Sequence, residues 1–226
     1  MPHAALDNPF WSSLRTVHGG IARVQGQVAR YPAEYAPFLG VSDDGVDVAD
    51  AMEALVASGE SVYLLGVIPK IPVGWTLQAF RSLAQMVCEA PLEVVVGPQV
   101  TVLGDAHRAD VLALVAQVYP HYFRESTQEL GRYLGIYQQG RLAAMAGERL
   151  GNTEAREMSA ICTSPDFNGR GYARRLTAQL SNETLAAGQM PFLHVSHENT
   201  RAFQLYQQMG YRHRRDIGFW SLRRNG

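Results

Sequence analysis

The feature that most constrains the fold is the run from Ile161 to Ala173, in which an apolar strand passes through a glycine-containing turn into a helix. The helix is expected to continue to about Ala187, where Gly188 supplies a stop. Backbone N–H groups in the first turn of a helix have no intrahelical acceptor, and the helix dipole adds partial positive charge there. Gly169 and Gly171 permit a tight turn and let a ligand approach the backbone without meeting a Cβ atom. The run therefore predicts a phosphate-binding turn at the start of a helix, and a turn that only joins strand to helix is the alternative interpretation.

Two common phosphate-binding motifs do not fit this turn, because it lacks the lysine of the Walker sequence and the third glycine of the dinucleotide fingerprint. The turn instead resembles the Gln/Arg-x-x-Gly-x-Gly/Ala signature of GNAT acetyltransferases, with Asn168 in place of the Gln or Arg. In that family the amides of the turn bind the pyrophosphate of coenzyme A. The resemblance implies a coenzyme A site formed by the turn and the arginine that follows it: Asn168, Gly169, Arg170, Gly171, Tyr172, Ala173 and Arg174.

A second motif runs from Asn199 to Tyr211 and resembles the GNAT sequence Asn-x-x-Ala-x-x-Leu-Tyr-x-x-x-Gly-Phe/Tyr at every specified position. Asn199 is expected to cap a helix that Gly210 ends. The resemblance implies that Asn199, Ala202 and Tyr206 contact coenzyme A. It also implies that the phenol of Tyr206 protonates the thiolate that leaves when an amine attacks a thioester. A tyrosine of the core is the alternative interpretation.

The strand before the turn has a predicted role as well. The resemblance implies that Ile161, Cys162 and Thr163 bind the pantetheine arm, and that a backbone N–H of this strand stabilises the developing oxyanion of the thioester carbonyl. Cys162 keeps a covalent route open, although its apolar neighbours favour an inert thiol and direct attack by the amine. Within the family, the region from Arg141 to Thr163 looks closest to the glycine-N-acyltransferase-like branch.

An acceptor ammonium must lose a proton before it can attack, because an alkylamine has a pKa of about 10.4. Glu148 and Glu157 are the candidate bases, and we favour Glu148 because it interrupts a strand of small and apolar residues. Either carboxylate could instead be solvent-facing. His194 and His197, on or just beyond a later strand, are further candidates.

The pattern of the chain predicts a mixed α/β fold of two parts. Residues 1–100 read as a smaller α/β subdomain that shapes the acceptor pocket, and residues 101–226 as a GNAT domain with a central mixed, mainly antiparallel sheet flanked by helices. The second part is expected to begin with a helix ended by Pro120 and to continue in the order β-β-β-α-β-α-β. In the first part the expected elements are a helix over 48–57, a strand over 61–68, a helix over 76–88 and a strand over 92–96.

Composition narrows the remaining possibilities. The 226 residues have a formal net charge of −1, so no basic surface favours nucleic acid or an anionic membrane. Two cysteines form neither a disulfide framework nor a zinc site, and no apolar run is long enough to span a membrane. These features favour an unprocessed cytoplasmic protein without a metal, acting on a small-molecule or peptide amine, with oligomerisation possible. The predicted function is transfer of acetyl from acetyl-CoA to a primary amine, and the alternative is an acyl-CoA-binding sensor or scaffold without catalysis.

Overall fold

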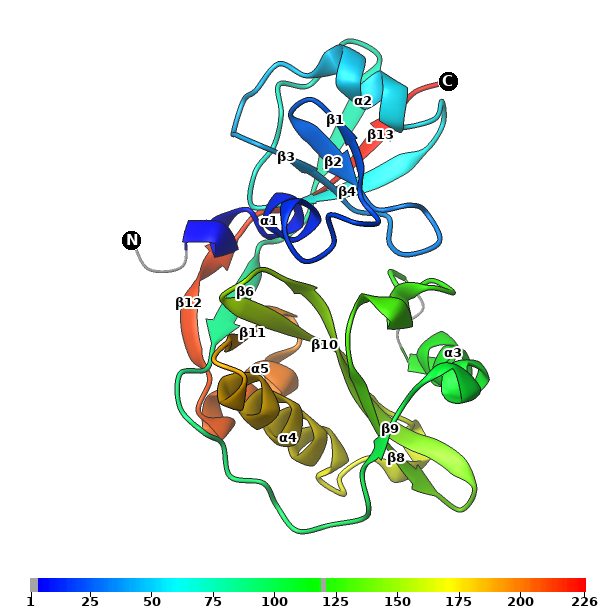
Figure 1. Cartoon of the computed structure of the whole chain (residues 1–226), viewed down its shortest axis with the longest axis vertical. Helices are drawn as coiled ribbons and strands as arrows, with labels where there is room; N and C mark the ends of the chain where they lie inside the picture. The colour runs from blue at the N-terminus through cyan, green and yellow to red at the C-terminus, as the bar shows by residue number, and fades with distance from the viewer. Residues whose placement is uncertain (1–3, 119–120) are drawn as a thin grey trace.

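The computed structural model describes residues 4–118 and 121–226, and the chain folds into two lobes that are joined by long strands (Figure 1). The lower lobe in Figure 1 is built on a seven-stranded sheet in the order β12-β6-β11-β10-β9-β8-β7. Its strands are β6 (Leu83–Val87), β7 (Thr101–Val102), β8 (Tyr133–Gln138), β9 (Arg141–Gly151), β10 (Ala155–Thr163), β11 (Met190–Ser196) and β12 (Arg212–Ile217).

Every neighbouring pair in this sheet is antiparallel except β10 and β11, which run parallel. Two helices cover one face, α4 (Tyr172–Ala186) and α5 (Thr200–Met209), while α3 (Arg108–Val118) packs on the other face against β9 and β10. Short 3₁₀ turns, η2 (Asp105–His107), η3 (Thr127–Leu130) and η4 (Pro165–Phe167), complete this lobe. The predicted mixed, mainly antiparallel sheet flanked by helices is confirmed.

The upper lobe holds two three-stranded sheets and two short helices. One sheet contains β1 (Arg23–Gln25), β2 (Val28–Arg30) and β3 (Leu39–Val41), and the other has the order β4-β13-β5. The strands of the second sheet are β4 (Ser61–Leu65), β5 (Trp75–Ala79) and β13 (Phe219–Arg224). The helices are α1 (Pro9–Arg15), which follows the 3₁₀ turn η1 (Ala4–Asp7), and α2 (Ala49–Leu55).

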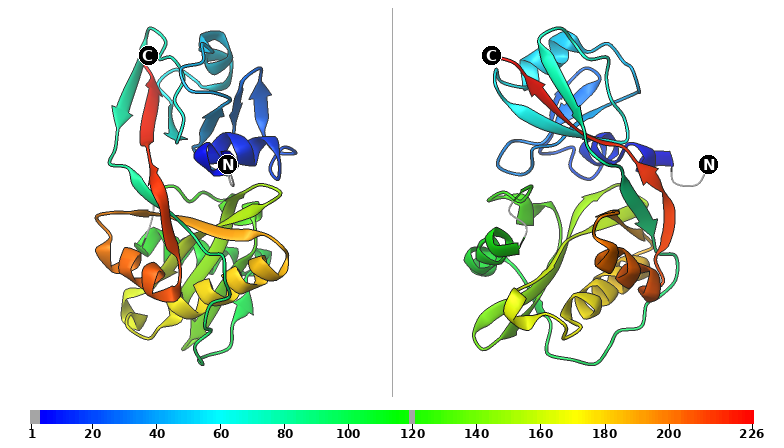
Figure 2. Two further views of the ribbon diagram at one scale, coloured as in Figure 1. Left: turned by 90° about the vertical axis from the view of Figure 1, so that its left-hand side faces the viewer. Right: turned by 180° about the vertical axis from the view of Figure 1, so that it is seen from behind.

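The two halves of the sequence exchange strands. β6 comes from the first half but lies between β11 and β12 in the seven-stranded sheet, whereas β13 comes from the C-terminus and lies between β4 and β5 (Figure 2). The expected helix over 76–88 is therefore wrong, because this segment forms β5 and β6. Both faces of β6 are covered, so four consecutive residues, 84–87, are buried without the alternation that marks a half-exposed strand.

The segment between β6 and β7 also differs from the expectation. Residues 92–96 lie outside the strands of the structure. Both main-chain polar groups of Leu92 are hydrogen-bonded to the side chain of Asn182 on α4, at 2.7 and 2.8 Å. The strand expected over 92–96 is therefore wrong, because a helix side chain takes the place of a neighbouring strand. Pro120 lies outside the described residues. The division of the chain near residue 100 stays a prediction.

Candidate active site

A cleft of about 740 Å³ opens where β10 and β11 separate. The two strands pair only from Ala155 to Glu157 against Met190 to Phe192, so that beyond this point each strand is free of the other. The cleft is lined by Met158 and Leu193, which belong to the core beneath α4, and also by Arg149, Phe10 and Phe38, which pack on the opposite side. The opening therefore passes through the sheet, from the helix-covered face to the upper lobe.

An irregularity in β10 contributes to this opening. The register of β10 against β9 shifts between Ser159 and Cys162, and Ala160 adopts a left-handed φ of 50°. A bulge of this kind leaves main-chain groups without ladder partners and turns them away from the strand direction. Ile161 and Cys162 line the cleft, and pairing with β9 resumes at Cys162 and continues to Thr163 at the end of the strand.

The glycine turn follows β10 after the single turn η4. Gly169 and Gly171 have left-handed φ values of 78° and 74°, and a Cβ placed on either would meet no heavy atom of the described chain within 4 Å. Gly171 caps α4 without a side-chain hydrogen bond, and Arg175 N donates to Gly171 O at 3.0 Å. The N–H groups that precede Arg175 in the first turn of α4 have no acceptor within the helix. The surface above Gly169 and Gly171 is open.

The other residues of this turn that were predicted to contact coenzyme A differ in their surroundings. Asn168 is exposed, Ala173 is half-buried, and the ring of Tyr172 packs into the core beneath the sheet. The Arg170 guanidinium lies 5.2 Å from the centre of the Phe167 ring, on the surface beside the turn. Arg174 instead forms an ion pair with Glu93 at 3.2 Å, so its charge is directed to the extended segment that borders α4.

Helix α5 presents one face to the cleft. Asn199, Ala202 and Tyr206 all line it, at spacings that place them on the same side of a helix. The side chain of Asn199 accepts a hydrogen bond from Ala202 N at 3.1 Å, which is the cap expected from the sequence. Burial raises the pKa of Tyr206, and it raises the pKa of Cys162 to about 12. Both groups consequently keep their protons at neutral pH.

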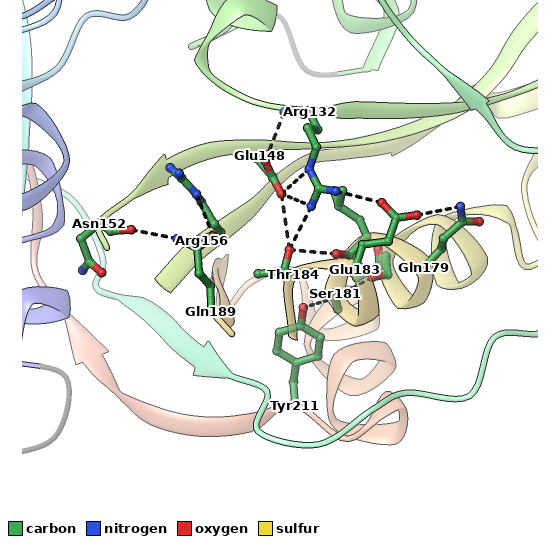
Figure 3. A network of polar contacts seen from close by, with 12 residues as sticks. Arg132, Glu148, Asn152, Arg156, Gln179, Ser181, Glu183, Thr184, Gln189 and Tyr211 are labelled. Carbon is green, nitrogen blue, oxygen red and sulfur yellow. Dashed lines mark hydrogen bonds and ion pairs between the residues drawn. The ribbon is translucent and has the colours of Figure 1, made fainter. Parts of the chain in front are cut away.

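Glu148 and Glu157 lie on opposite faces of the sheet. Glu148 faces α4, where Arg132 Nη2 donates to its Oε1 at 2.7 Å and Arg132 N donates to its Oε2 at 3.2 Å (Figure 3). Arg132 also pairs with Glu183 of α4 at 3.0 Å. The carboxylate of Glu148 thus joins the sheet to α4 and does not line the cleft in the described structure.

Glu157 is buried behind two residues that line the cleft. Its carboxylate accepts from Arg149 Nε and Nη2 at 2.9 Å each, and from His194 Nδ1 at 2.7 Å. Burial raises the pKa of Glu157, but the charge of Arg149 and the hydrogen bonds from Arg149 and His194 outweigh it and hold that pKa at about 2. A carboxylate held so firmly in its ionised form positions its neighbours and is a weak proton acceptor.

The two histidines that were expected beside the cleft differ in their surroundings. His194 lines the cleft, and its second nitrogen, Nε2, accepts from Gln85 Nε2 at 3.0 Å, while Gln85 Nε2 also donates to Leu6 O at 2.8 Å. His197 is on the surface and pairs with Asp216 at 2.8 Å. His121, which sequence reasoning missed, also lines the cleft. It lies in a loop after α3, where no motif marks it.

Known proteins with a similar sequence or structure agree with this fold. The family of FR47-like proteins matches residues 133–220, which run from β8 into β13. A GNAT-family acetyltransferase from Novosphingobium aromaticivorans is similar over 98% of this chain and 99% of its own, with 28% identity and a TM-score of 0.87. Residues 133–220 therefore match a GNAT-type acyltransferase domain, and the chain as a whole has the GNAT fold. The likeness to the Novosphingobium acetyltransferase includes the upper lobe, since it covers nearly the whole of both chains.

Two more distant structures share this fold. A GCN5-related N-acetyltransferase from Kribbella flavida aligns over 88% of both chains at 13% identity, with a TM-score of 0.64. A GCN5-related N-acetyltransferase-like protein from Streptococcus suis aligns over 91% of both chains at 14% identity, with a TM-score of 0.56. Comparison with curated protein sequences finds no significant match. The assignment to the glycine-N-acyltransferase-like branch stays a prediction.

Residues 4–118 and 121–226 contain neither a candidate metal centre nor a candidate membrane-spanning helix. Within these residues, no group of three or more His, Cys, Asp or Glu side chains is arranged to hold a metal ion. None of the helices there combines the length and the apolar character needed to cross a bilayer.

Proposed function

We propose that this protein is an N-acetyltransferase that moves an acetyl group from acetyl-CoA to a primary amine by direct attack in a ternary complex. The observation that supports this most is the opening between β10 and β11, which Tyr206 lines and which β10 connects to the exposed glycine turn. The first-turn N–H groups of α4, with Gly169 and Gly171 beneath open space, suit the pyrophosphate of coenzyme A. Arg170 adds a positive charge beside these N–H groups. The charge of Arg174 is instead paired with Glu93.

The chemistry follows from the groups that line the opening. The amine nitrogen attacks the thioester carbonyl carbon, the new C–N bond forms, and the C–S bond breaks. Main-chain N–H groups around the bulge at Ala160 are suited to stabilise the oxyanion, because they lie where the ladder of β10 is interrupted. Tyr206 keeps its proton because burial raises its pKa, so it can donate that proton to the leaving thiolate. The protonated thiol of Cys162 supports direct attack over an acyl-enzyme route.

The proton of the acceptor ammonium needs a base on the acceptor side of the sheet. Glu148 faces α4, and Glu157 is held ionised by Arg149, so we assign neither carboxylate this role. We favour His121 as the base, because it lines the cleft beside Tyr122 and an imidazole is the commonest general base in enzymes. His121→Gln should lower kcat most at neutral pH, with recovery as the pH rises and more of the acceptor becomes free amine. An equal loss at all pH values would argue against His121 as the base.

The charge of the chain and the size of the cleft bear on the acceptor and on the compartment. The near-neutral charge of the chain and the small volume of the cleft suit a small-molecule or peptide amine in the cytoplasm, with no nucleic acid or membrane partner.

Calorimetric titration with acetyl-CoA tests the cofactor site directly. Gly171→Glu places a carboxylate in the turn and should abolish binding by charge repulsion and bulk. Gly188→Glu is the matched control, because Gly188 also has a left-handed φ, 76°, and open space around it, but lies at the far end of α4. Equal binding by both variants and the wild type would refute the turn as the pyrophosphate site.

Turnover separates an enzyme from a sensor. Release of the coenzyme A thiol in the presence of a panel of amines should be detected for the wild type and should fall by about 10²-fold or more in Tyr206→Phe, since general acid catalysis contributes about 10²–10⁴-fold. Tight binding of acetyl-CoA without transfer to any amine would leave the sensor or scaffold as the better interpretation.

A further inference from the structure

Four aromatic side chains form one continuous surface on the upper side of the cleft. These residues, which we call the aromatic wall, are Phe38, Phe80, Tyr122 and Phe219. The ring centres of Phe80 and Phe219 are 5.2 Å apart, those of Phe219 and Tyr122 are 5.9 Å apart, and those of Tyr122 and Phe38 are 6.2 Å apart. Such separations are typical of rings in contact. The wall is therefore a connected array and not a set of scattered apolar residues.

The rings of the aromatic wall are supported from behind. The ring of Tyr63 lies 5.0 Å from Tyr122, 5.6 Å from Phe219 and 6.2 Å from Phe80, and it does not line the cleft in the described structure. Three of the four wall residues retain partial exposure, and Phe80 is 39% exposed. A preformed, partly exposed aromatic surface inside a cleft is suited to a flat apolar ligand group, because burying that group removes apolar area from water at little cost in protein ordering.

The aromatic wall lies in the same cleft as the proposed reaction site but on the other side of the sheet from α4. Phe10 packs on Phe38 with ring centres 4.3 Å apart, and Arg149 lies over Phe38 at 5.1 Å. Arg149 and Phe38 thus connect the wall to the opening that Cys162 lines. A group on this side would reach the thioester from the face opposite the cofactor turn.

The charges around the wall disfavour an acceptor with a second cation. Within the described part of the chain, Glu198 is the one acidic residue that lines the cleft. It is 66% exposed at its side chain and pairs with Arg81 at 3.3 Å. The charge of Glu157, behind the lining, is matched by Arg149. A polyamine or a lysine-rich peptide would therefore find little carboxylate charge to compensate its additional ammonium groups.

We infer that the acceptor is a small primary amine carrying an aromatic ring, which stacks on the aromatic wall while its amine points through the sheet to the thioester. This inference rests on the proposed acetyl transfer and names the acceptor class for the same site. The volume of about 740 Å³ must hold the end of the acyl-carrying arm as well as the acceptor, which suits an amine with a single ring system.

A comparison of three amines tests the inference: 2-phenylethylamine, n-propylamine and 1,4-diaminobutane. With acetyl-CoA as donor, kcat/KM for 2-phenylethylamine should exceed that for either of the others by about tenfold or more, as expected for one well-packed aromatic contact. Phe80→Ala should reduce this preference by about tenfold, while Phe80→Tyr should retain it. Val73→Ala is the control, because Val73 is fully exposed on the same lobe and outside the cleft lining. A higher kcat/KM for 1,4-diaminobutane, or a preference that Phe80→Ala leaves unchanged, would overturn the inference.

A binding measurement separates failure of this inference from failure of the proposed function. If acetyl-CoA binds but no amine is acetylated, calorimetry with 2-phenylethylamine on the protein saturated with coenzyme A examines the wall without catalysis. Saturable binding that weakens in Phe80→Ala would uphold the wall as an aromatic-amine site even though the transfer proposal fails. Absence of binding to the wild type would overturn the wall as well.

Discussion

Replacing Glu157 by glutamine removes one buried negative charge and changes the volume of the side chain little. The carboxylate is 1% exposed, and the side chain of its partner Arg149 is 15% exposed. In Glu157→Gln the guanidinium of Arg149 would therefore lose the charged acceptor of its two hydrogen bonds of 2.9 Å. Arg149 lies over Phe38 and is mostly buried, so its guanidinium has little access to water. Removing one partner of a buried ion pair typically costs about 3–5 kcal/mol.

The pKa of Glu157 leads to a similar magnitude. A carboxyl group lowered from 4.5 to about 2 stabilises the folded state at neutral pH by about 3 kcal/mol, at about 1.4 kcal/mol per pKa unit. Because the folded pKa is the lower one, this stability is fully present above pH 4.5 and is lost as the pH falls toward 2. For a chain of this size, a loss of about 3 kcal/mol should lower Tm by about 6–12 °C.

Urea unfolding and thermal unfolding followed by circular dichroism would measure the effect. Glu148→Gln is the matched control, because Glu148 is also buried but its partner Arg132 is 48% exposed and can turn to water. We expect the control to lose only about 1 kcal/mol. Between pH 5 and 3 the wild type should also lose more stability than Glu157→Gln. Equal losses for the two variants at neutral pH, or an equal pH dependence, would refute the reasoning.

Three further substitutions test single features of the fold. Ala160→Gly should keep or raise stability in urea by up to about 1 kcal/mol, because the left-handed φ of 50° is unstrained only for glycine; a clear loss would contradict this. Gly147→Ala should lower the free energy of unfolding by more than about 2 kcal/mol, because its Cβ would lie 2.2 Å from the Tyr133 ring. Gly104→Ala is the control and should change it by under about 0.5 kcal/mol, because a Cβ there meets open space. Burial lowers the pKa of His18 from 6.5, so the stability it contributes is full above pH 6.5 and is lost as the pH falls; His18→Gln should flatten the pH dependence of urea unfolding in that window.

The local motifs were the most predictable part of the protein. The glycine turn at the start of α4 and the capped helix α5 could be read from residues that are neighbours along the chain. The meander β8–β9–β10 followed in the same way, because two turns separate three strand-like runs. The segment over 76–88 could not be assigned correctly, because a strand covered on both faces has the same apolar spacing as a short buried helix.

The roles of the two glutamates show a second limit. Alternation along β9 places Glu148 and Arg149 on opposite faces, but the sequence does not tell which face carries the cleft. That depends on β11 separating from β10, and on α4 covering the side where Glu148 lies. Glu148, the base that the sequence favoured, consequently forms an ion pair with Arg132 on the face covered by α4.

By itself, the sequence determined the strand, turn and helix around Gly169 and Gly171, the cap at Asn199 and the family of the C-terminal part, because these depend on hydrogen bonds and steric limits between near neighbours. Only the tertiary structure decided that β6 enters the central sheet and that β13 leaves it for the upper lobe. It alone assembled Phe38, Phe80, Tyr122 and Phe219 into one wall, since each comes from a different segment. Contacts of this kind depend on sheet order and register, which are set by the packing of the whole chain and leave no periodic signal in any one segment.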